Sequence, residues 1–314
     1  MGKIAFVFPG QGSQTVGMAQ EIANEHADVM AVLHQADKKL GYSLSQLMFE
    51  GPQDELTLTF NAQPALLTAS YAIFKKLEEA GIAPDYVAGH SLGEYSALVA
   101  SKSISFEDAV YAVHNRGKFM EEAVPAGEGT MAAVLGMAAG ELEKVTNEVT
   151  ETIAPVQLAN LNCPGQIVIS GSTEGVKVAS EKAKEAGAKR VIPLVVSGPF
   201  HSSLMKPAAS KLEEMLKEIK ISSPTVPVIG NVDAKEVVDA NEIEQKLIEQ
   251  LYSPVRWEES VERMIDLGVD TFIEVGPGKV LSGLIKKINR RATTLPVYDI
   301  QSLQDAVKKL QVEG

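Results

Sequence analysis

The sequence predicts an α/β protein in which a domain built on a parallel sheet is interrupted by a smaller inserted subdomain. Apolar runs alternate with helix-forming segments on both sides of the insert, a pattern that favours a parallel sheet covered by helices. Between them, residues 126–197 follow the order β-α-β-β-α-β, which is typical of a ferredoxin-like unit. We therefore expect a large domain formed by residues 1–125 and 198–314, with the ferredoxin-like subdomain at 126–197.

The N-terminal region begins with an apolar run at residues 3–8, which predicts a buried strand. A glycine-rich loop follows, but Thr15 stands where a dinucleotide-binding fingerprint would have its third glycine. Helical patterns come next, notably over residues 27–40 and 63–80. This part of the chain therefore indicates a strand, a loop and helices, without a nucleotide-binding motif.

A short strand at residues 86–88 runs into the pentapeptide Gly89-His90-Ser91-Leu92-Gly93 and then into a helix-forming segment. Gly-x-Ser-x-Gly between a strand and a helix is the pattern of a nucleophile elbow, which predicts that the large domain is α/β-hydrolase-like. The backbone N–H of Leu92 would then point to where an oxyanion forms, and the opening helix adds partial positive charge. The alternative is a glycine-rich loop in which Ser91 only caps the helix.

A serine nucleophile needs a base, and His201 is our choice among the five histidines. It follows a Ser-Gly-Pro-Phe turn, and loops on a rigid scaffold often carry functional groups. His90 adjoins Ser91 on a tight turn, where neighbouring side chains diverge, and His114 lies in mid-helix, where we expect a structural role. No carboxylate lies in a suitable loop between the serine and His201, which argues against a plain esterase.

Arg116 falls on the apolar stripe of a helix that we expect to begin after Ser105, as its N-cap, and to run to residue 123. An arginine directed inward is costly unless an anion or several acceptors meet it. Arg116 is therefore a candidate anion-binding residue. The alternative is an arginine at the edge of the stripe, or one paired with Glu121 or Glu122.

Composition narrows the class of protein further. The chain has 314 residues and a net charge of −12, which argues against nucleic acid or an anionic membrane as the main partner. Cys163 is the one cysteine, so an intrachain disulfide is impossible and a reducing cytoplasm is expected. The N-terminal apolar run is too short for a signal peptide. The sequence contains neither His-x-x-x-His nor Cys-x-x-Cys, the spacings typical of metal-binding motifs.

Several motifs together resemble a known family, the malonyl-CoA:acyl-carrier-protein transacylases of type II fatty acid synthesis. Each motif is weak alone, but five of them in order along the whole chain are highly specific. They are Phe8-Pro9-Gly10-Gln11-Gly12-Ser13-Gln14, Gly89-His90-Ser91-Leu92-Gly93-Glu94, Arg116-Gly117, Gly198-Pro199-Phe200-His201-Ser202 and Glu274-Val275-Gly276-Pro277-Gly278.

The resemblance implies a role for each residue that matches a family position. Ser91 would be the nucleophile, His201 its base, and Arg116 the residue that holds the malonyl carboxylate through a two-pronged contact. The other implied site residues are Gln11 and Leu92 for the oxyanion hole, Gln250 to orient His201 through its main-chain carbonyl, Asn160 and Asn162 near the cleft, and Phe200, which resembles the version that selects malonyl over methylmalonyl.

The resemblance also implies the partners. The donor would be malonyl-CoA, the acceptor the phosphopantetheine thiol of holo acyl carrier protein, and no bound cofactor or metal is needed beyond the coenzyme A thioester substrate. We expect a monomer. Because carrier proteins are usually acidic, docking needs a basic patch; the densest cluster is Lys286, Lys287, Arg290 and Arg291, and Lys189 with Arg190 is a second. Each cluster could equally be a solvated helix face.

Three other functions share some of these residues. An esterase would use Ser91 and His201 without needing Arg116 or Gln11. A polyketide-type acyltransferase with another extender unit would differ mainly near Phe200. A non-catalytic module that binds carrier protein would form no acyl-serine.

Overall fold

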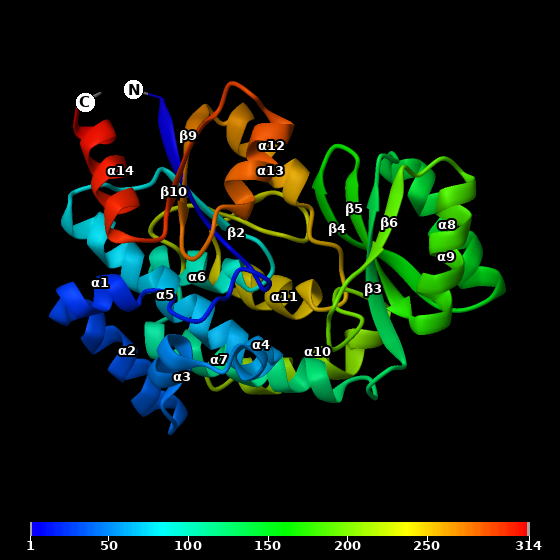
Figure 1. Ribbon diagram of the computed structural model, residues 1–314, viewed down its shortest axis with the longest axis horizontal. Coiled ribbons are helices and arrows are strands. Elements are labelled where there is room, and N and C mark those ends of the chain that lie inside the picture. The colour runs from blue at the N-terminus through cyan, green and yellow to red at the C-terminus, as the bar shows by residue number, and fades with distance from the viewer. Residues whose placement is uncertain (1, 313–314) are drawn as a thin grey trace.

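The computed structural model describes residues 2–312, and they form two sheets with helices packed on both (Figure 1). The predicted fold class is confirmed: a large α/β-hydrolase-like domain with a parallel sheet carries a smaller ferredoxin-like subdomain, which stands to one side of it (Figure 1). The N-terminal strand and the C-terminal helix lie together at the far end of the large domain.

The larger sheet has the strand order β10-β9-β1-β2-β7-β8. All adjacent pairs are parallel except the last, in which β8 runs antiparallel to β7. The strands are β1 (Lys3–Phe8), β2 (Tyr86–Gly89), β7 (Val228–Ile229), β8 (Glu236–Val237), β9 (Val269–Val275) and β10 (Thr293–Val297). Because the carboxyl ends of parallel strands share one edge, the loops after β1, β2 and β7 meet there.

Helices cover both faces of this sheet. Alternate residues of a strand point to opposite faces, so Ala5 and Val7 of β1 pack with residues of α12 and α13, whereas Phe6 and Phe8 face a second and larger core. The helices of the large domain are α1 (Gln20–Glu25), α2 (Ala27–Leu40), α3 (Leu44–Glu50), α4 (Gln53–Thr57), α5 (Thr59–Glu79), α6 (Gly93–Ala100), α7 (Phe106–Glu122), α10 (Lys206–Leu216), α11 (Ala240–Gln250), α12 (Trp257–Asp266), α13 (Val280–Ile288) and α14 (Ile300–Val312).

The smaller sheet is antiparallel with the order β4-β5-β3-β6. Its helices pack on one face over a core of their own, on the side turned away from the large domain (Figure 1). The subdomain consists of β3 (Gly129–Leu135), α8 (Ala139–Thr152), β4 (Val156–Cys163), β5 (Gln166–Ser172), α9 (Thr173–Glu185) and β6 (Arg190–Pro193). Its element order and strand order are those of the predicted ferredoxin-like unit.

Strand β4 joins the two parts. The backbone of Val255 in the large domain donates to the carbonyl of Ala159 at 2.8 Å and accepts from the N–H of Leu161 at 2.9 Å. The side chain of Gln157 reaches the backbone carbonyls of His201 and Tyr252 at 3.3 and 3.2 Å. One edge of the smaller sheet is therefore tied to the loops of the large domain.

Helix α5 begins at Thr59, four residues before the start that the sequence predicted. The prediction was wrong because Pro64 lies inside the helix, where it removes one backbone donor. The carbonyl left without that donor belongs to Phe60, and it accepts a hydrogen bond from His114 Nδ1 at 2.8 Å. His114 thus has a structural contact, as expected, and the predicted Ser105 N-cap is confirmed by its bond from the N–H of Asp108.

Candidate active site

The turn that carries Ser91 is sharp and closely packed. It connects β2 to α6, and Ser91 adopts φ 52°, in the left-handed region that a side chain occupies at a cost of about 1–3 kcal/mol. A Cβ added at Gly89 would collide with the backbone of Gly93, and one at Gly93 would collide with the carbonyl of Phe8. Both glycines are therefore required for strand and helix to approach each other at this turn.

Ser91 and His201 lie within hydrogen-bond distance although they are 110 residues apart in the sequence. Ser91 Oγ is 2.8 Å from His201 Nε2, and His201 Nδ1 is 2.8 Å from the backbone carbonyl of Gln250. A carbonyl can only accept, so Nδ1 carries the proton and Nε2 is left as the acceptor for the serine hydroxyl. A neutral carbonyl thus occupies the position where a hydrolase would have a carboxylate.

Arg116 is 1 % exposed and points at the serine. One of its terminal nitrogens lies 3.2 Å from Ser91 Oγ and 2.8 Å from Gln250 Oε1, and the other donates to Gln63 Oε1 at 2.8 Å. These direct partners are neutral oxygens, so the guanidinium keeps a positive charge that an anion beside Ser91 could use.

The alternative partners of Arg116 are engaged elsewhere. Glu121 accepts from the backbone N–H of Thr59 at 2.8 Å, and Glu122 pairs with Lys211 at 2.7 Å. The alternative of a surface arginine paired with either glutamate is therefore wrong. Arg116 is buried because polar side chains of α5 and α11 meet it there, those of Gln63 and Gln250. The helical pattern alone does not reveal this polar pocket.

Burial and charge set the protonation states around the dyad. Burial lowers the pKa of His201 to about 3, and the nearby positive charge of Arg116 adds to that lowering. Burial raises the pKa of Glu94 to about 7, although the side chain of Gln250 donates to its carboxylate at 2.5 Å. His201 is therefore neutral at physiological pH, whereas Glu94 titrates close to it.

We expect the reactivity of Ser91 to show no loss at the ordinary histidine pKa of about 6.5. His201 stays unprotonated down to a pH near 3, so it remains able to accept the serine proton as the pH falls from 8 to 5. The measurement is the rate of covalent labelling of Ser91 against pH. Glu94→Gln is the control. If the wild-type pH profile has an inflection near pH 7 and Glu94→Gln lacks it, the inflection belongs to Glu94. An inflection that persists in Glu94→Gln contradicts a neutral His201.

The loop after β1 faces the same serine. Gln11, His90, Ser91, Phe200 and His201 line a cavity of about 170 Å³, together with other residues of the two domains. Among residues 2–312, the backbone N–H groups of Gln11 and Leu92 donate to no other backbone group. The side chain of Gln11 donates to Thr59 Oγ1 at 3.3 Å, which holds the loop against the start of α5.

Of the two asparagines of β4, Asn160 reaches the cavity from the smaller subdomain, and Asn162 contacts His90. Asn160 lines the cavity, and Asn162 Oδ1 lies 2.8 Å from His90 Nε2. His90 is thus directed away from Ser91, as the sequence predicted for adjacent side chains on a tight turn. Phe200 is buried at the cavity wall next to His201.

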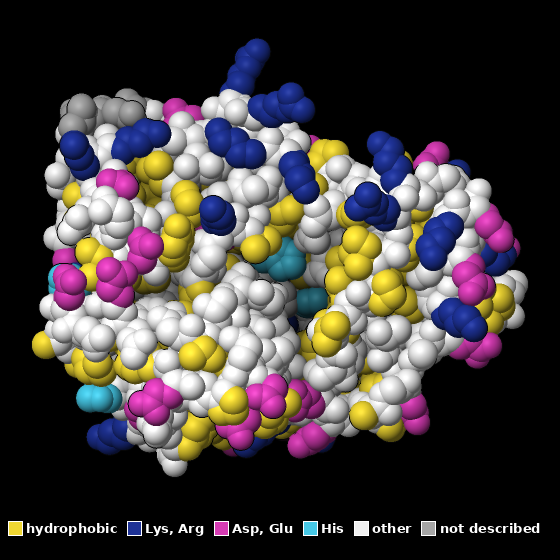
Figure 2. All heavy atoms as spheres, in the orientation of Figure 1, with side chains coloured by type: hydrophobic (Ala, Val, Ile, Leu, Met, Phe, Trp, Pro, Cys, Tyr) yellow, Lys and Arg dark blue, Asp and Glu magenta, His cyan; other side chains and the backbone are white. Residues whose placement is uncertain are grey.

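The predicted docking cluster lies at the end of α13 and outside the cavity. Its four residues are exposed; Lys286 Nζ donates to the carbonyl of Ala292 at 2.5 Å and Lys287 Nζ to Gln166 Oε1 at 2.9 Å. Figure 2 shows a hollow between the two parts of the molecule with histidine at its floor and Lys and Arg side chains above it. The basic cluster is therefore separate from the reacting groups.

Three residues of the site were absent from the sequence prediction of site residues. Gln63 holds Arg116, Glu94 accepts from Gln250, and Asn231 Oδ1 accepts from the backbone N–H of Ser91 at 2.7 Å. Asn231 is the second residue after β7, and the rule that ligands bind beyond the carboxyl ends of parallel strands could have indicated it. Gln63 lies within α5 and carries no comparable signal, whereas Glu94 is the last residue of the motif around Ser91, which could have indicated it.

Within the described residues, no group of three or more His, Cys, Asp or Glu side chains could hold a metal ion. Residues 2–312 likewise contain no helix with both the length and the apolar character needed to cross a membrane.

The chain is similar to known proteins over its whole length. The pattern of the acyl transferase domain family matches residues 5–309. The malonyl CoA-acyl carrier protein transacylase of Bacillus subtilis is 60% identical over 314 residues, which cover 100% of this chain and 99% of the relative. An acyl carrier protein S-malonyltransferase structure from Vibrio cholerae has a TM-score of 0.95 and 46% identity, covering 97% of this chain and 99% of that one.

A malonyl-transacylase solved in complex with its holo type II PKS acyl-carrier protein has a TM-score of 0.95 and 45% identity, covering 98% of this chain and 99% of that one. These likenesses exceed what a shared fold alone requires, because they combine high identity with coverage of both chains from end to end. The chain belongs to the acyl transferase family and, within it, to the malonyl CoA-acyl carrier protein transacylases.

Proposed function

We propose that this chain transfers a malonyl group from malonyl-CoA to the phosphopantetheine thiol of acyl carrier protein, through a malonyl ester of Ser91. The observation that carries the proposal is a serine–histidine pair with a buried arginine on the same serine oxygen: Arg116 lies 3.2 Å and His201 2.8 Å from Ser91 Oγ. The names of the close relatives support the same donor and acceptor.

The first half-reaction forms the acyl-enzyme. Ser91 Oγ attacks the thioester carbonyl, and its proton passes to His201 Nε2, which the geometry leaves unprotonated. The backbone N–H groups of Gln11 and Leu92 hold the oxyanion, while the charge of Arg116 binds the malonyl carboxylate. The tetrahedral intermediate collapses, the carbon–sulfur bond breaks, and coenzyme A leaves with the proton from His201.

The second half-reaction repeats these steps with a new nucleophile. The thiol of the carrier protein gives its proton to His201 and attacks the malonyl-serine ester, and the serine oxygen leaves with that proton. The two substrates use one site in turn, so ping-pong kinetics follow. Arg116 holds the short diacid in register for the thiol, which favours transfer over hydrolysis.

The deciding experiment is intact-protein mass spectrometry after incubation with a panel of acyl-CoAs. Malonyl-CoA is expected to add one malonyl group to Ser91, and holo carrier protein is expected to remove it again. Parallel incubations with a fatty-acid and a type II polyketide carrier protein decide the acceptor. Release of malonate to water alone would support an esterase, a preference for a bulkier acyl group would support another extender unit, and no adduct would support a binding module.

We also propose that residues 126–197 act as a unit that carries Asn160 and Asn162 to the cleft, and that the protein works as a cytoplasmic monomer without a bound cofactor. Support for the unit is its separate sheet, which lies within residues 129–193 and has a core of its own. Support for the location is the single free cysteine, Cys163, which suits a reducing compartment.

Carrier-protein docking is proposed on the basic cluster Lys286, Lys287, Arg290 and Arg291. Reversing two charges, by Lys286→Glu with Lys287→Glu, is expected to raise the KM for carrier protein several-fold at low salt, because an acidic partner loses its attraction. The effect should shrink as salt rises and screens the charges. The KM for malonyl-CoA in the same assay should not change.

The matched control is Lys308→Glu with Lys309→Glu, which makes the same change of charge on the exposed face of α14. If the two double variants raise the carrier-protein KM equally, the effect is one of net charge and the docking cluster is wrong. The second cluster, Lys189 and Arg190 on the smaller subdomain, is then the next candidate for the same substitution.

A further inference from the structure

Asn231 spans the turn that carries Ser91. It is 1 % exposed and lies in the loop directly after β7. Its Nδ2 donates to the carbonyl of Gly89 at 2.6 Å, and its Oδ1 accepts from the N–H of Ser91 at 2.7 Å. These two backbone groups lie on either side of His90, so a single side chain closes the turn from both ends.

The turn needs this support because its conformation is unfavourable. Ser91 adopts φ 52°, and a non-glycine residue in that region persists only when its surroundings hold it there. Without the Asn231 side chain, the carbonyl of Gly89 and the N–H of Ser91 would also lose these hydrogen-bond partners. A buried polar group left without a partner costs about 1–3 kcal/mol. Relaxation of the turn would move Ser91 Oγ away from both His201 and Arg116.

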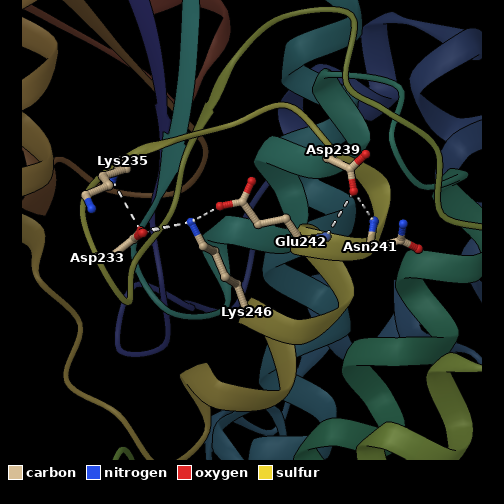
Figure 3. Close-up of polar contacts among 6 residues, drawn as sticks. All are labelled: Asp233, Lys235, Asp239, Asn241, Glu242 and Lys246. Carbon is tan, nitrogen blue, oxygen red and sulfur yellow. Dashed lines mark hydrogen bonds and ion pairs between the residues drawn. The ribbon is translucent and has the colours of Figure 1, made fainter.

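Asn231 is itself held by an ion pair two residues along the chain. Both carboxylate oxygens of Asp233 accept from Lys246 Nζ, at 3.1 and 2.9 Å, and Glu242 pairs with the same nitrogen at 2.7 Å (Figure 3). Lys246 is only 9 % exposed and lies on α11, one helical turn before Gln250. The ion pair therefore ties the loop of Asn231 to the helix whose Gln250 orients His201.

The backbone around Asn231 is equally restrained. The N–H of Gly230 donates to the carbonyl of Lys235 at 2.9 Å, and that of Ala234 donates to the carbonyl of Gly230 at 3.1 Å. The carbonyl of Asn231 accepts from the N–H of Arg256 at 2.9 Å. Asn231 thus sits in a closed turn with its backbone tied to the next segment and little freedom to follow a moving Ser91.

We propose that Asn231 is the positioning residue of the nucleophile, and that Lys246 sets the position of Asn231 through Asp233. The inference rests on the proposed role of Ser91 and deepens it. Asn231 is not among the residues that line the Ser91 cavity; it acts by holding the Ser91 backbone, so that the hydroxyl stays in line with His201 Nε2. A displacement of about 1 Å at a reacting atom is enough to cost roughly 10²-fold in rate.

The test compares Asn231→Ala with wild type in two reactions of Ser91. One is acylation by malonyl-CoA; the other is labelling by a small neutral fluorophosphonate, in which the serine oxygen bonds to phosphorus, fluoride leaves and His201 takes the proton. Asn231→Ala is expected to slow both reactions by a similar factor, about 10- to 100-fold. The KM for malonyl-CoA should stay within about threefold, because Arg116 is untouched.

Asn241→Ala is the matched control, since this asparagine is exposed on the first turn of α11, next to Glu242 in the sequence, and its side chain lies apart from the Lys246–Asp233 pair (Figure 3). It should label at the wild-type rate. Lys246→Met should slow labelling about 3- to 10-fold through the loss of the ion pair with Asp233. If circular dichroism shows that Asn231→Ala is unfolded, Lys246→Met is used as the test variant instead.

The outcomes separate the two proposals. Wild-type protein that neither reagent labels at Ser91 would refute the proposed function itself. Wild type that labels, together with a folded Asn231→Ala that labels equally fast or changes only the KM, would overturn the positioning role. A folded Lys246→Met variant that labels at the wild-type rate would show that Lys246 does not contribute to the positioning of Asn231.

Discussion

Ser91→Ala is expected to abolish the malonyl-enzyme. Among residues 2–312, the Ser91 hydroxyl oxygen is the only hydrogen-bond partner of His201 Nε2, at 2.8 Å, and alanine leaves the histidine with nothing to deprotonate. Loss of a nucleophile that acts together with its base costs on the order of 10⁶-fold in turnover. The measurement is incorporation of radioactive malonyl from malonyl-CoA, followed by mass spectrometry of the labelled peptide.

Ser96→Ala is a suitable control for that substitution, because Ser96 is a buried serine on α6 five residues further along. It should incorporate malonyl as the wild type does. A Ser91→Ala protein that still carries malonyl would show that another residue is the nucleophile, and the assignment of the elbow would be wrong.

Arg116→Ala is expected to remove the preference for malonyl over neutral acyl groups. A carboxylate that loses a buried, two-pronged arginine loses roughly 3–4 kcal/mol, which corresponds to about 10²–10³-fold in kcat/KM for malonyl-CoA. Acetyl-CoA has no carboxylate, so its transfer should fall much less or even rise. The measurement is kcat/KM for the two thioesters in the same assay.

Two controls separate this role from a structural one. Fluorophosphonate labelling of Ser91 reports whether the dyad survives the loss of the bonds from Arg116 to Gln63 and Gln250. Arg116→Lys keeps the charge but not the planar fork, so it should recover only part of the malonyl preference. Malonyl transfer that is unchanged in Arg116→Ala would show that the carboxylate is bound elsewhere.

Local patterns in the sequence were enough to predict the fold class and the element order of the inserted subdomain. Alternating apolar runs and helical stripes are short-range signals, and the strand–turn–helix around Ser91 has a characteristic spacing of glycines. The predicted helix that follows Ser105 agrees with α7 within a residue at its end. By contrast, α3, α4, β8, β10 and α14 were not predicted, and the predicted start of α5 at residue 63 lies four residues after the true start at Thr59.

The roles implied for the site residues remain predictions, but their positions can be compared with the structure. Ser91, His201 and Arg116 meet within 3.2 Å, and Gln250 reaches His201 through its carbonyl. Gln250 also accepts from Arg116 and donates to Glu94 through its side chain, contacts that no sequence pattern indicated. The basic cluster at the end of α13 lies apart from these groups, and its proposed role in docking is tested by the carrier-protein KM of the charge-reversal variant.

The sequence by itself determined which chemical groups are present and the local backbone that presents them: a serine on a tight turn, a histidine in a loop, and an arginine on an apolar stripe. Only the tertiary structure decided how they combine, because Ser91, Arg116, His201 and Gln250 come from four separate segments. Their distances depend on the parallel sheet and on helix packing, which no local pattern encodes. The support that Asn231 gives to Ser91, across 140 residues of chain, is therefore visible only in the folded protein.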